Sequence, residues 1–238
     1  MNQNHNLINR RSFLNLTGTS GMALMAAVMG SGFWSMHSDR AIAAPLETLT
    51  PDAALKRLMD GNQRFVQQKS QHPDQSQARL VEVAQAQHPF VTVLSCADSR
   101  VAPEILFDEG IGDIFDIRIA GNIITPEVLG SLEYAVTLLN TPLLVVLGHE
   151  RCGAVTAAVA GESLPGNIGS FVKAIQPALS KIDNESGDRV DAAVSANVQY
   201  QIEKLKRDST IVSERSRDGK LKVVGGRYDL DTGTVTLI

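Results

Sequence analysis

Short, strongly apolar segments alternate along this chain with longer stretches of helical periodicity. The clearest apolar segment is 143–147 (Leu-Leu-Val-Val-Leu), and the others lie at 90–94, 114–119 and 222–224. Apolar runs of this length, bounded by polar or turn-forming residues, are typical of strands buried on both faces. Strands that alternate with helices predict an α/β fold, with a mostly parallel central sheet flanked by helices.

Helical segments are expected between and beyond these strands. Residues from Pro45 to about Gln68 are predicted to form a helical arm, with the helix itself beginning near Pro51, at about 51–68. The polar residues 69–77 follow it. A helix is predicted to begin at Thr125-Pro126-Glu127, because threonine caps the first turn and proline is favoured inside it. Apolar residues at helical spacing predict three more helices, at 152–160, 168–181 and 192–207.

The carboxyl-terminal residues have the pattern of a hairpin. Asp229-Leu230-Asp231-Thr232-Gly233 has the composition of a tight turn, which would join strands at 222–228 and 234–238. The hairpin gives the sheet an antiparallel edge. Because no repeat or change of composition marks a second domain, residues 44–238 are predicted to form one domain.

The first forty-three residues have the features of an export signal. Arg10-Arg11 precedes a mildly apolar stretch at 14–34 that glycines interrupt, and the small residues Ala41-Ile42-Ala43 fit a cleavage site. This order predicts a twin-arginine-type signal peptide at 1–43 and export to a periplasm, or to a thylakoid lumen in a photosynthetic host. The interrupting glycines disfavour a stable membrane span. A disordered tail and a retained amphipathic anchor are the alternatives.

Charge and cysteine content exclude other classes of protein. The net charge is −4, and cleavage at residue 43 would make the chain more acidic because the signal holds three arginines and one aspartate. A nucleic-acid-binding surface is therefore not expected. Two cysteines cannot build a disulfide framework, so their positions carry the information.

Both cysteines follow predicted strands closely. Cys96 comes just after 90–94, and His149 and Cys152 come just after 143–147. Because the carboxyl ends of parallel strands meet at one edge of a sheet, these side chains are expected to lie together. The His-x-x-Cys spacing suits the start of a helix, where residues three apart share a face. Two thiolates and an imidazole favour tetrahedral Zn²⁺, and three protein ligands leave a fourth position open for catalysis.

Asp98 is the natural candidate for that fourth position. Arg100 lies two residues further on and can pair with the Asp98 carboxylate through two hydrogen bonds. Asp98 is therefore either a fourth metal ligand or is held away from the metal by Arg100. The simpler interpretation of the cysteines is that they pack as small apolar residues. A thioredoxin-type redox pair is disfavoured because the chain has no Cys-x-x-Cys.

These motifs resemble those of the β-class carbonic anhydrases. Cys96-Ala97-Asp98-Ser99-Arg100, Arg118-Ile119-Ala120-Gly121-Asn122 and Gly148-His149-Glu150-Arg151-Cys152-Gly153 carry the resemblance, which runs from about Pro51 to Tyr228. It implies zinc-dependent reversible hydration of CO₂ to bicarbonate and a proton by zinc-bound hydroxide. One Zn²⁺ per subunit would be held by Cys96, His149 and Cys152, with Asp98 and Arg100 as the catalytic pair. The family also implies a homodimer or homotetramer.

The resemblance also implies residues that contact the substrate. Gln87 matches a glutamine that donates to bound CO₂ or bicarbonate, Phe115 and Tyr134 match aromatic walls, and Gly153 leaves room for close backbone approach.

Some members of the family have an inhibitory bicarbonate pocket built from Trp, Arg and Tyr. Arg118 and Tyr134 match two of its members, but Val93 stands at the Trp position. An active site that stays open at neutral pH is therefore expected.

Two other functions remain as alternatives. The same fold and metal could hydrolyse carbon disulfide or carbonyl sulfide, which an assay of sulfide release would detect. The chain could instead be a non-catalytic zinc-binding assembly protein. Asp98 and Arg100 argue against that second alternative, because a purely structural metal site needs neither.

Overall fold

The computed structural model describes residues 49–238 except 162, 181 and 183–187. The predicted signal peptide at 1–43 and its cleavage site lie outside the described residues. Among the described helices, none combines the length and apolar character needed to cross a bilayer.

One five-stranded sheet forms the centre of the described part of the chain. Its order is β2-β1-β3-β4-β5, with β5 antiparallel to β4 and the other pairs parallel. The α/β fold with an antiparallel edge is thus confirmed, and the predicted strands agree with those observed to within two residues at each end, the hairpin strand at 222–228 matching β4. The strands are β1 (Val91–Ser95), β2 (Ile114–Arg118), β3 (Leu143–His149), β4 (Lys222–Tyr228) and β5 (Val235–Leu237).

Helices cover both faces of this sheet. They are α1 (Pro51–Val66), α2 (Gln77–Val83), α3 (Pro103–Leu106), α4 (Pro126–Thr137), α5 (Gly153–Ala160), α6 (Gly169–Leu179), α7 (Arg189–Asp208) and α8 (Thr210–Arg217), with 3₁₀ turns at Ala120–Asn122 and Gly166–Ile168. The sequence predicted α1, α4, α5, α6 and α7. It missed α2, α3 and α8, which have 7, 4 and 8 residues, because so few turns give little periodicity to recognise.

The starts of α1 and α4 follow the signals in the sequence. The Thr50 hydroxyl accepts a hydrogen bond from the backbone N–H of Ala53, and that of Thr125 accepts one from Val128. A proline occupies the first turn of each helix, where its missing N–H costs nothing.

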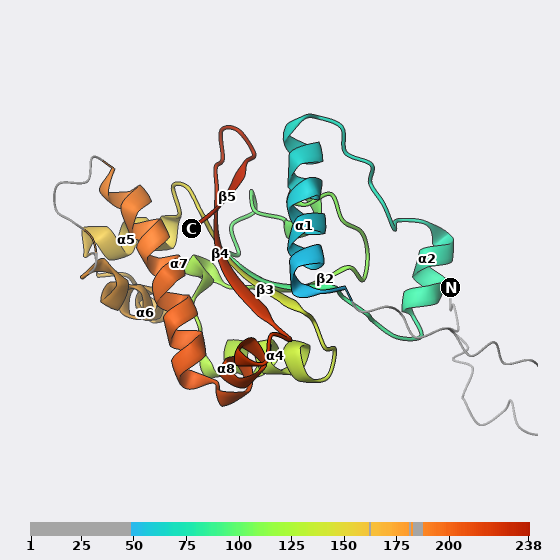
Figure 1. The fold of residues 1–238 in the computed structure, drawn as a ribbon. Helices are drawn as coiled ribbons and strands as arrows, with labels where there is room; N and C mark the ends of the chain where they lie inside the picture. The colour runs from blue at the N-terminus through green and yellow to red at the C-terminus, as the bar shows by residue number, and fades with distance from the viewer. Residues whose placement is uncertain (1–48, 162, 181, 183–187) are drawn as a thin grey trace, which may run out of the picture. The chain divides into compact units, whose positions relative to one another are not determined.

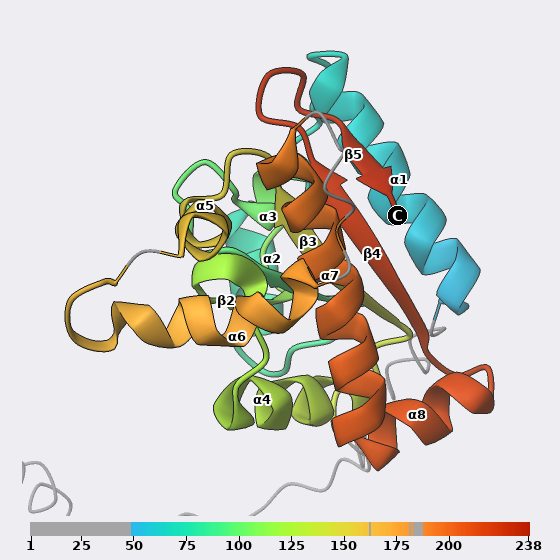
Figure 2. The same cartoon turned by 90° about the vertical axis from the view of Figure 1, so that its left-hand side faces the viewer.

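The alternation of side chains along β3 divides the core into two layers. Leu143, Val145 and Leu147 pack with residues of α1 and α3, whereas Leu144 and Val146 pack with residues of α4, α7 and α8. Figures 1 and 2 show α1 on one side of the sheet and α7 on the other. Because both faces of the sheet are covered, only the ends of its strands are free to hold polar functional groups.

The pH dependence of stability is expected to include a contribution from Asp116 in β2. Burial and, next, the negative charge of Glu104 raise the pKa of Asp116 to about 6, against the opposing effects of Arg118 and Ser95. The folded state therefore keeps its proton to a higher pH than the unfolded chain, whose aspartates titrate near 3.9. This site's contribution to stability is lost as the pH rises from about 4 to about 6.

Urea unfolding of the wild-type protein and the Asp116→Asn variant at several pH values tests this expectation. The variant should gain stability relative to the wild-type protein as the pH rises through this window. Glu104→Gln removes the nearby negative charge that raises the pKa of Asp116. In the Glu104→Gln background, the stability gained on replacing Asp116 by Asn should therefore be smaller. A difference that stays constant with pH would contradict the assignment.

Candidate metal centre

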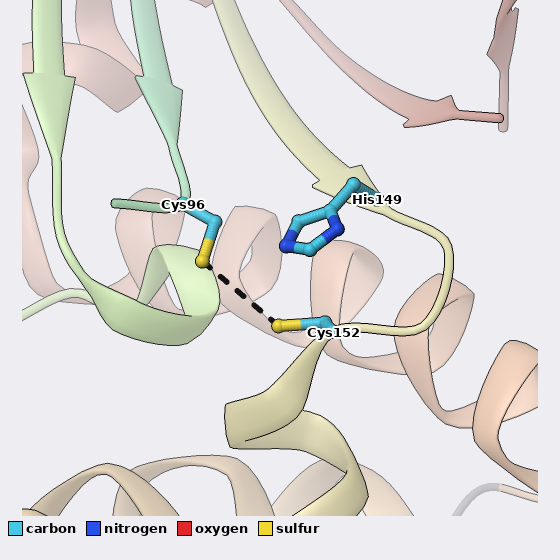
Figure 3. A group of neighbouring side chains, drawn as sticks. All are labelled: Cys96, His149 and Cys152. Atoms are coloured by element: carbon cyan, nitrogen blue, oxygen red, sulfur yellow. Dashed lines mark hydrogen bonds between the residues drawn. The ribbon is translucent and has the colours of Figure 1, made fainter. Parts of the chain in front are cut away.

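Three metal-ligating side chains lie together at the carboxyl ends of β1 and β3. The Sγ atoms of Cys96 and Cys152 are 3.9 Å apart, and one ligand atom from each of Cys96, His149 and Cys152 lies within 4.8 Å of the others. Figure 3 shows the imidazole facing both thiols. The structure thus brings together the three residues that the sequence pointed to.

His149 and Cys152 approach each other differently from what the sequence suggested. The spacing suggested that both sit at the start of one helix, but His149 ends β3 and Cys152 is the residue that caps α5. Between them the chain turns sharply, with Arg151 at φ 51°. The left-handed backbone of Arg151, rather than helical periodicity, brings the two ligands together.

The hydrogen bonding of His149 leaves one ring nitrogen available for a metal. Its Nδ1 lies 2.9 Å from the carbonyl oxygen of Glu150, so Nδ1 carries the proton and donates. The side chain is 0% exposed, and its Nε2 has no hydrogen-bond partner among the described residues. A buried, unpartnered lone pair beside two thiols fits a metal ligand and would be costly without one.

The contact between the two thiols shifts their pKa values in opposite directions. The hydrogen bond from Cys152 lowers the pKa of Cys96 to about 4 despite its burial, and His149 and the Gly121 N–H lower it further. The same bond, together with burial, raises the pKa of Cys152. The hydrogen bond between the thiols therefore favours ionisation of Cys96 before Cys152, and a bound dication would displace the proton of Cys152. Two thiolates and a neutral imidazole then balance the charge of a divalent ion.

A buried polar network, which the sequence analysis missed, supports Cys96. The N–H of Gly121 lies 3.3 Å from the Cys96 sulfur, and the Gly121 carbonyl accepts a hydrogen bond from the Asn197 side chain at 2.9 Å. Gln201 donates to Asn197 and accepts from the Ile124 N–H. Asn197 and Gln201 lie four residues apart on the apolar face of α7. Two polar residues at helical spacing among apolar ones are the sequence pattern from which a buried polar pair could have been predicted.

Replacement of Asn197 by Leu is expected to destabilise the protein. The change leaves the Gly121 carbonyl and the Gln201 amide buried without partners, which costs about 1–3 kcal/mol of unfolding free energy. Urea unfolding of the metal-free protein measures the cost. Gln199→Leu, on the exposed face of the same helix, should change stability by no more than roughly 0.5 kcal/mol. Equal effects of both variants would contradict this role for Asn197.

Asp98 is paired with Arg100 and is not part of the Cys96–His149–Cys152 group. Two atoms of the Arg100 guanidinium, Nε and Nη2, donate to the two carboxylate oxygens at 2.9 and 2.7 Å, and the Arg100 N–H adds a third bond. These hydrogen bonds hold the pKa of Asp98 well below its usual range. Of the two arrangements considered from the sequence, the structure has the one in which Arg100 holds the carboxylate. Oδ2 of Asp98 still lies 3.8 Å from Nε2 of His149.

Arg118 fixes the backbone of the loop that carries Cys96 and Asp98. Its guanidinium donates to the carbonyl oxygens of these two residues, at 3.1 and 2.6 Å. Arg118 and Tyr134 match two members of the inhibitory bicarbonate pocket, whose Trp position is occupied by Val93 in this chain. In the structure, Tyr134 packs against Phe115 with ring centroids 6.0 Å apart. Residues 115 and 118 point to opposite faces of β2.

The other expected substrate residues come from different elements of the chain. Gln87 lines a cavity of about 450 Å³ with Phe90 and Pro142, at the end of the sheet where β1 begins, whereas Cys96 follows the end where β1 finishes. Phe115 and Tyr134 lie on β2 and α4, and Tyr134 is 43% exposed. Gly153 follows Cys152 directly, and a Cβ atom there would meet no described atom within 4 Å.

Comparisons with known proteins agree with this geometry. A family model described as "Carbonic anhydrase" matches residues 91–235. The chain is 44% identical to "Carbonic anhydrase 2" of Mycobacterium tuberculosis, covering 79% of this chain and 92% of that protein. It is 42% identical to a carbonic anhydrase of Mycolicibacterium smegmatis, covering 79% and 93%.

Solved structures show the same fold. The β-carbonic anhydrase CcaA is 27% identical with a TM-score of 0.60, covering 77% of this chain and 94% of that one. The β-carbonic anhydrase CafA of Aspergillus fumigatus is 26% identical with a TM-score of 0.61, covering 79% and 89%. With the Cys-His-Cys group at the carboxyl edge of its parallel strands, the chain belongs to the β-class carbonic anhydrases, the enzymes that hydrate CO₂ reversibly to bicarbonate.

Proposed function

We propose that one Zn²⁺ per subunit, held by Cys96, His149 and Cys152, supports CO₂ hydration in this chain, and that Asp98 and Arg100 orient the reacting water. The observation that carries the proposal is the buried, unpartnered Nε2 of His149 beside two thiols 3.9 Å apart. Sulfur and nitrogen donors in this ratio favour zinc over the harder Mg²⁺ and Ca²⁺.

The residues around the proposed metal have distinct tasks in the reaction. When bound, Zn²⁺ supplies a Lewis acid that lowers the pKa of a coordinated water molecule. Asp98 can accept a hydrogen bond from the attacking water and so aim an oxygen lone pair at the carbon of CO₂. Arg100 keeps the carboxylate ionised and fixed in direction. The Glu150 carbonyl holds the tautomer of His149 in which Nε2 is free to bind the metal.

The position of Gln87 favours an oligomer. β1 has five residues, which span roughly 17 Å at about 3.3 Å per residue, and Gln87 and Cys96 lie beyond its opposite ends. If Gln87 contacts a substrate, that substrate lies at the metal group of a second copy of the chain. We therefore propose a homodimer or a homotetramer, with Gln87, Phe115 and Tyr134 contributing across the interface. Two related enzymes from Sordaria macrospora are described as tetrameric.

Export is proposed from residues 1–43. The paired arginines, the apolar stretch and the Ala-Ile-Ala site stand in the order of a twin-arginine signal. That route carries folded proteins, so the thiolates could be loaded with metal before they meet an oxidising compartment. Detection of the cleaved chain outside the cytoplasm, and its loss when Arg10 and Arg11 are both changed to Lys, would test the proposal.

Stopped-flow measurement of CO₂ hydration by zinc-loaded and metal-free protein tests the proposed chemistry. Because two thiolates neutralise the charge of the ion, the rate is expected to rise from about pH 7 to about pH 9. Removal of zinc should abolish the activity, and its return should restore it. Zinc-loaded protein without activity at any pH would refute the proposal, and release of sulfide from carbon disulfide would then favour the alternative hydrolase.

A further inference from the structure

We propose that the ion pair between Arg151 and Asp231 acts as a latch that positions His149 and Cys152 for metal binding. Both residues lie outside the group of ligands, so they are positioning residues rather than catalytic ones. The inference rests on the metal site proposed above. The turn between β4 and β5, which is distant in sequence from His149 and Cys152, would thereby help to support the metal site.

The loop between the two ligands is held in an unfavourable conformation. Arg151 has φ 51°, a region that residues with a side chain rarely occupy because Cβ crowds the carbonyl oxygen. His149 and Cys152 lie on either side of this turn, and both are almost fully buried. Relaxation of Arg151 to an ordinary backbone conformation would change the direction in which one ligand points relative to the other. Some interaction must therefore hold the turn.

Arg151 is held by a two-point contact with Asp231. Its Nη1 and Nη2 atoms donate to the two carboxylate oxygens of Asp231 at 2.9 and 2.7 Å. Two parallel hydrogen bonds fix the direction of the guanidinium as well as its distance. The neighbouring Glu150 is tied to the same hairpin, because its N–H donates to the Tyr228 carbonyl and its carboxylate accepts from the Leu230 N–H. Both residues between the ligands are thus attached to the β4–β5 hairpin.

The hairpin itself is rigid enough to act as an anchor. The Asp229 carboxylate accepts from the N–H groups of Asp231 and Thr232, which fixes the turn. Asn62 of α1, only 3% exposed, donates to the Gly233 carbonyl and accepts from the Val235 N–H. A continuous set of hydrogen bonds therefore runs from α1 through the hairpin turn to the loop between His149 and Cys152.

The latch acts through geometry more than through overall stability. Asp231 and Arg151 are 68% and 51% exposed, and an ion pair this exposed to water contributes little to the stability of the fold. Loss of the pair should therefore leave the unfolding of the metal-free protein nearly unchanged. A metal site, in contrast, is sensitive to ligand direction, and loss of a supporting contact outside the ligand shell commonly weakens metal binding by about 10–100-fold.

The test compares Asp231→Asn with Asp218→Asn in the full chain. Asp218 pairs with Lys220 in the exposed turn before β4, at the other end of that strand, so its replacement removes the same charge far from the ligand loop. Affinity for Zn²⁺ is measured by competition with a chromophoric chelator, and ligand geometry by the absorption spectrum of the Co²⁺-loaded protein. We expect D231N to bind Zn²⁺ about tenfold more weakly and to have an altered Co²⁺ spectrum, and D218N to match the wild-type protein.

A charge swap separates the latch from a general effect of either substitution. R151D and D231R should each weaken Zn²⁺ binding, whereas the double variant should recover most of it, because the ion pair is rebuilt in reverse. Equal Zn²⁺ affinity in D231N and the wild-type protein, or equal weakening in D231N and D218N, would overturn the inference. If the wild-type protein itself fails to bind Zn²⁺, the proposed metal site fails and the latch fails with it.

Discussion

Replacement of Cys152 by Ser is expected to remove metal binding and, with it, CO₂ hydration. The hydroxyl of serine stays protonated near neutral pH and is a far poorer ligand for zinc than a thiolate. Cys152 caps the start of α5, and serine is a favoured capping residue, so α5 should still form. The loss of Zn²⁺ affinity should therefore exceed the roughly 10–100-fold typical of a contact outside the ligand shell. Metal content after dialysis and stopped-flow hydration measure the two effects.

The metal-free wild-type protein is the control for this variant. If Cys152 acts as a ligand, C152S should match metal-free wild-type protein in urea unfolding, since both lack the same stabilising ion. Added zinc should then stabilise the wild-type protein but not the variant. Stoichiometric zinc and normal turnover in C152S would exclude Cys152 from the ligand set.

The second large effect is expected for Asp98→Asn, which should slow turnover while leaving zinc in place. Asparagine keeps the size of the side chain but loses the charge that accepts the hydrogen bonds from Arg100. Water would then no longer be oriented by a fixed anion 3.8 Å from the Nε2 atom of His149. We expect turnover to fall by about a hundredfold or more. Stopped-flow hydration and zinc content of the same sample measure the two properties.

Two further variants test whether the loss of turnover in D98N comes from the Asp98–Arg100 pair rather than from the loss of any negative charge. Arg100→Lys keeps a positive charge but cannot form the two-point contact, so it should reduce turnover less than D98N does. Asp218→Asn removes an exposed carboxylate far from the group and should leave turnover unchanged. Because the pKa of Asp98 lies well below its usual range, wild-type activity should show no inflection from this carboxylate in weakly acidic solution. Near-normal hydration by D98N at every pH would refute its proposed role.

Much of the fold could be predicted because its signals are local. The apolar run 143–147 and the capping sequence Thr125-Pro126 give strand and helix without knowledge of their neighbours. The same locality explains the errors. The sequence suggested a helix for the His-x-x-Cys segment, but a sharp turn at Arg151 occupies it, and that turn is held by contacts with residues far along the chain.

The expected substrate residues illustrate a second limit. Gln87 and Cys96 are only nine positions apart, yet a strand between them carries them to opposite ends of the sheet. Phe115 and Arg118 are closer still and point to opposite faces of β2. Residues that lie close together in the sequence therefore need not lie close together in the folded chain.

The sequence by itself determined the ligand chemistry and the edge of the sheet at which the ligands meet. Residue type sets the chemistry of Cys96, His149 and Cys152, and strand direction sets which loops lie side by side. Only the tertiary structure decided that Arg100 holds Asp98, that Asn197 supports Gly121 from 76 positions away, and that Asp231 holds Arg151 from 80 positions away. Periodicity and propensity are properties of neighbouring residues, whereas these contacts exist only once helices and hairpins have packed against the sheet.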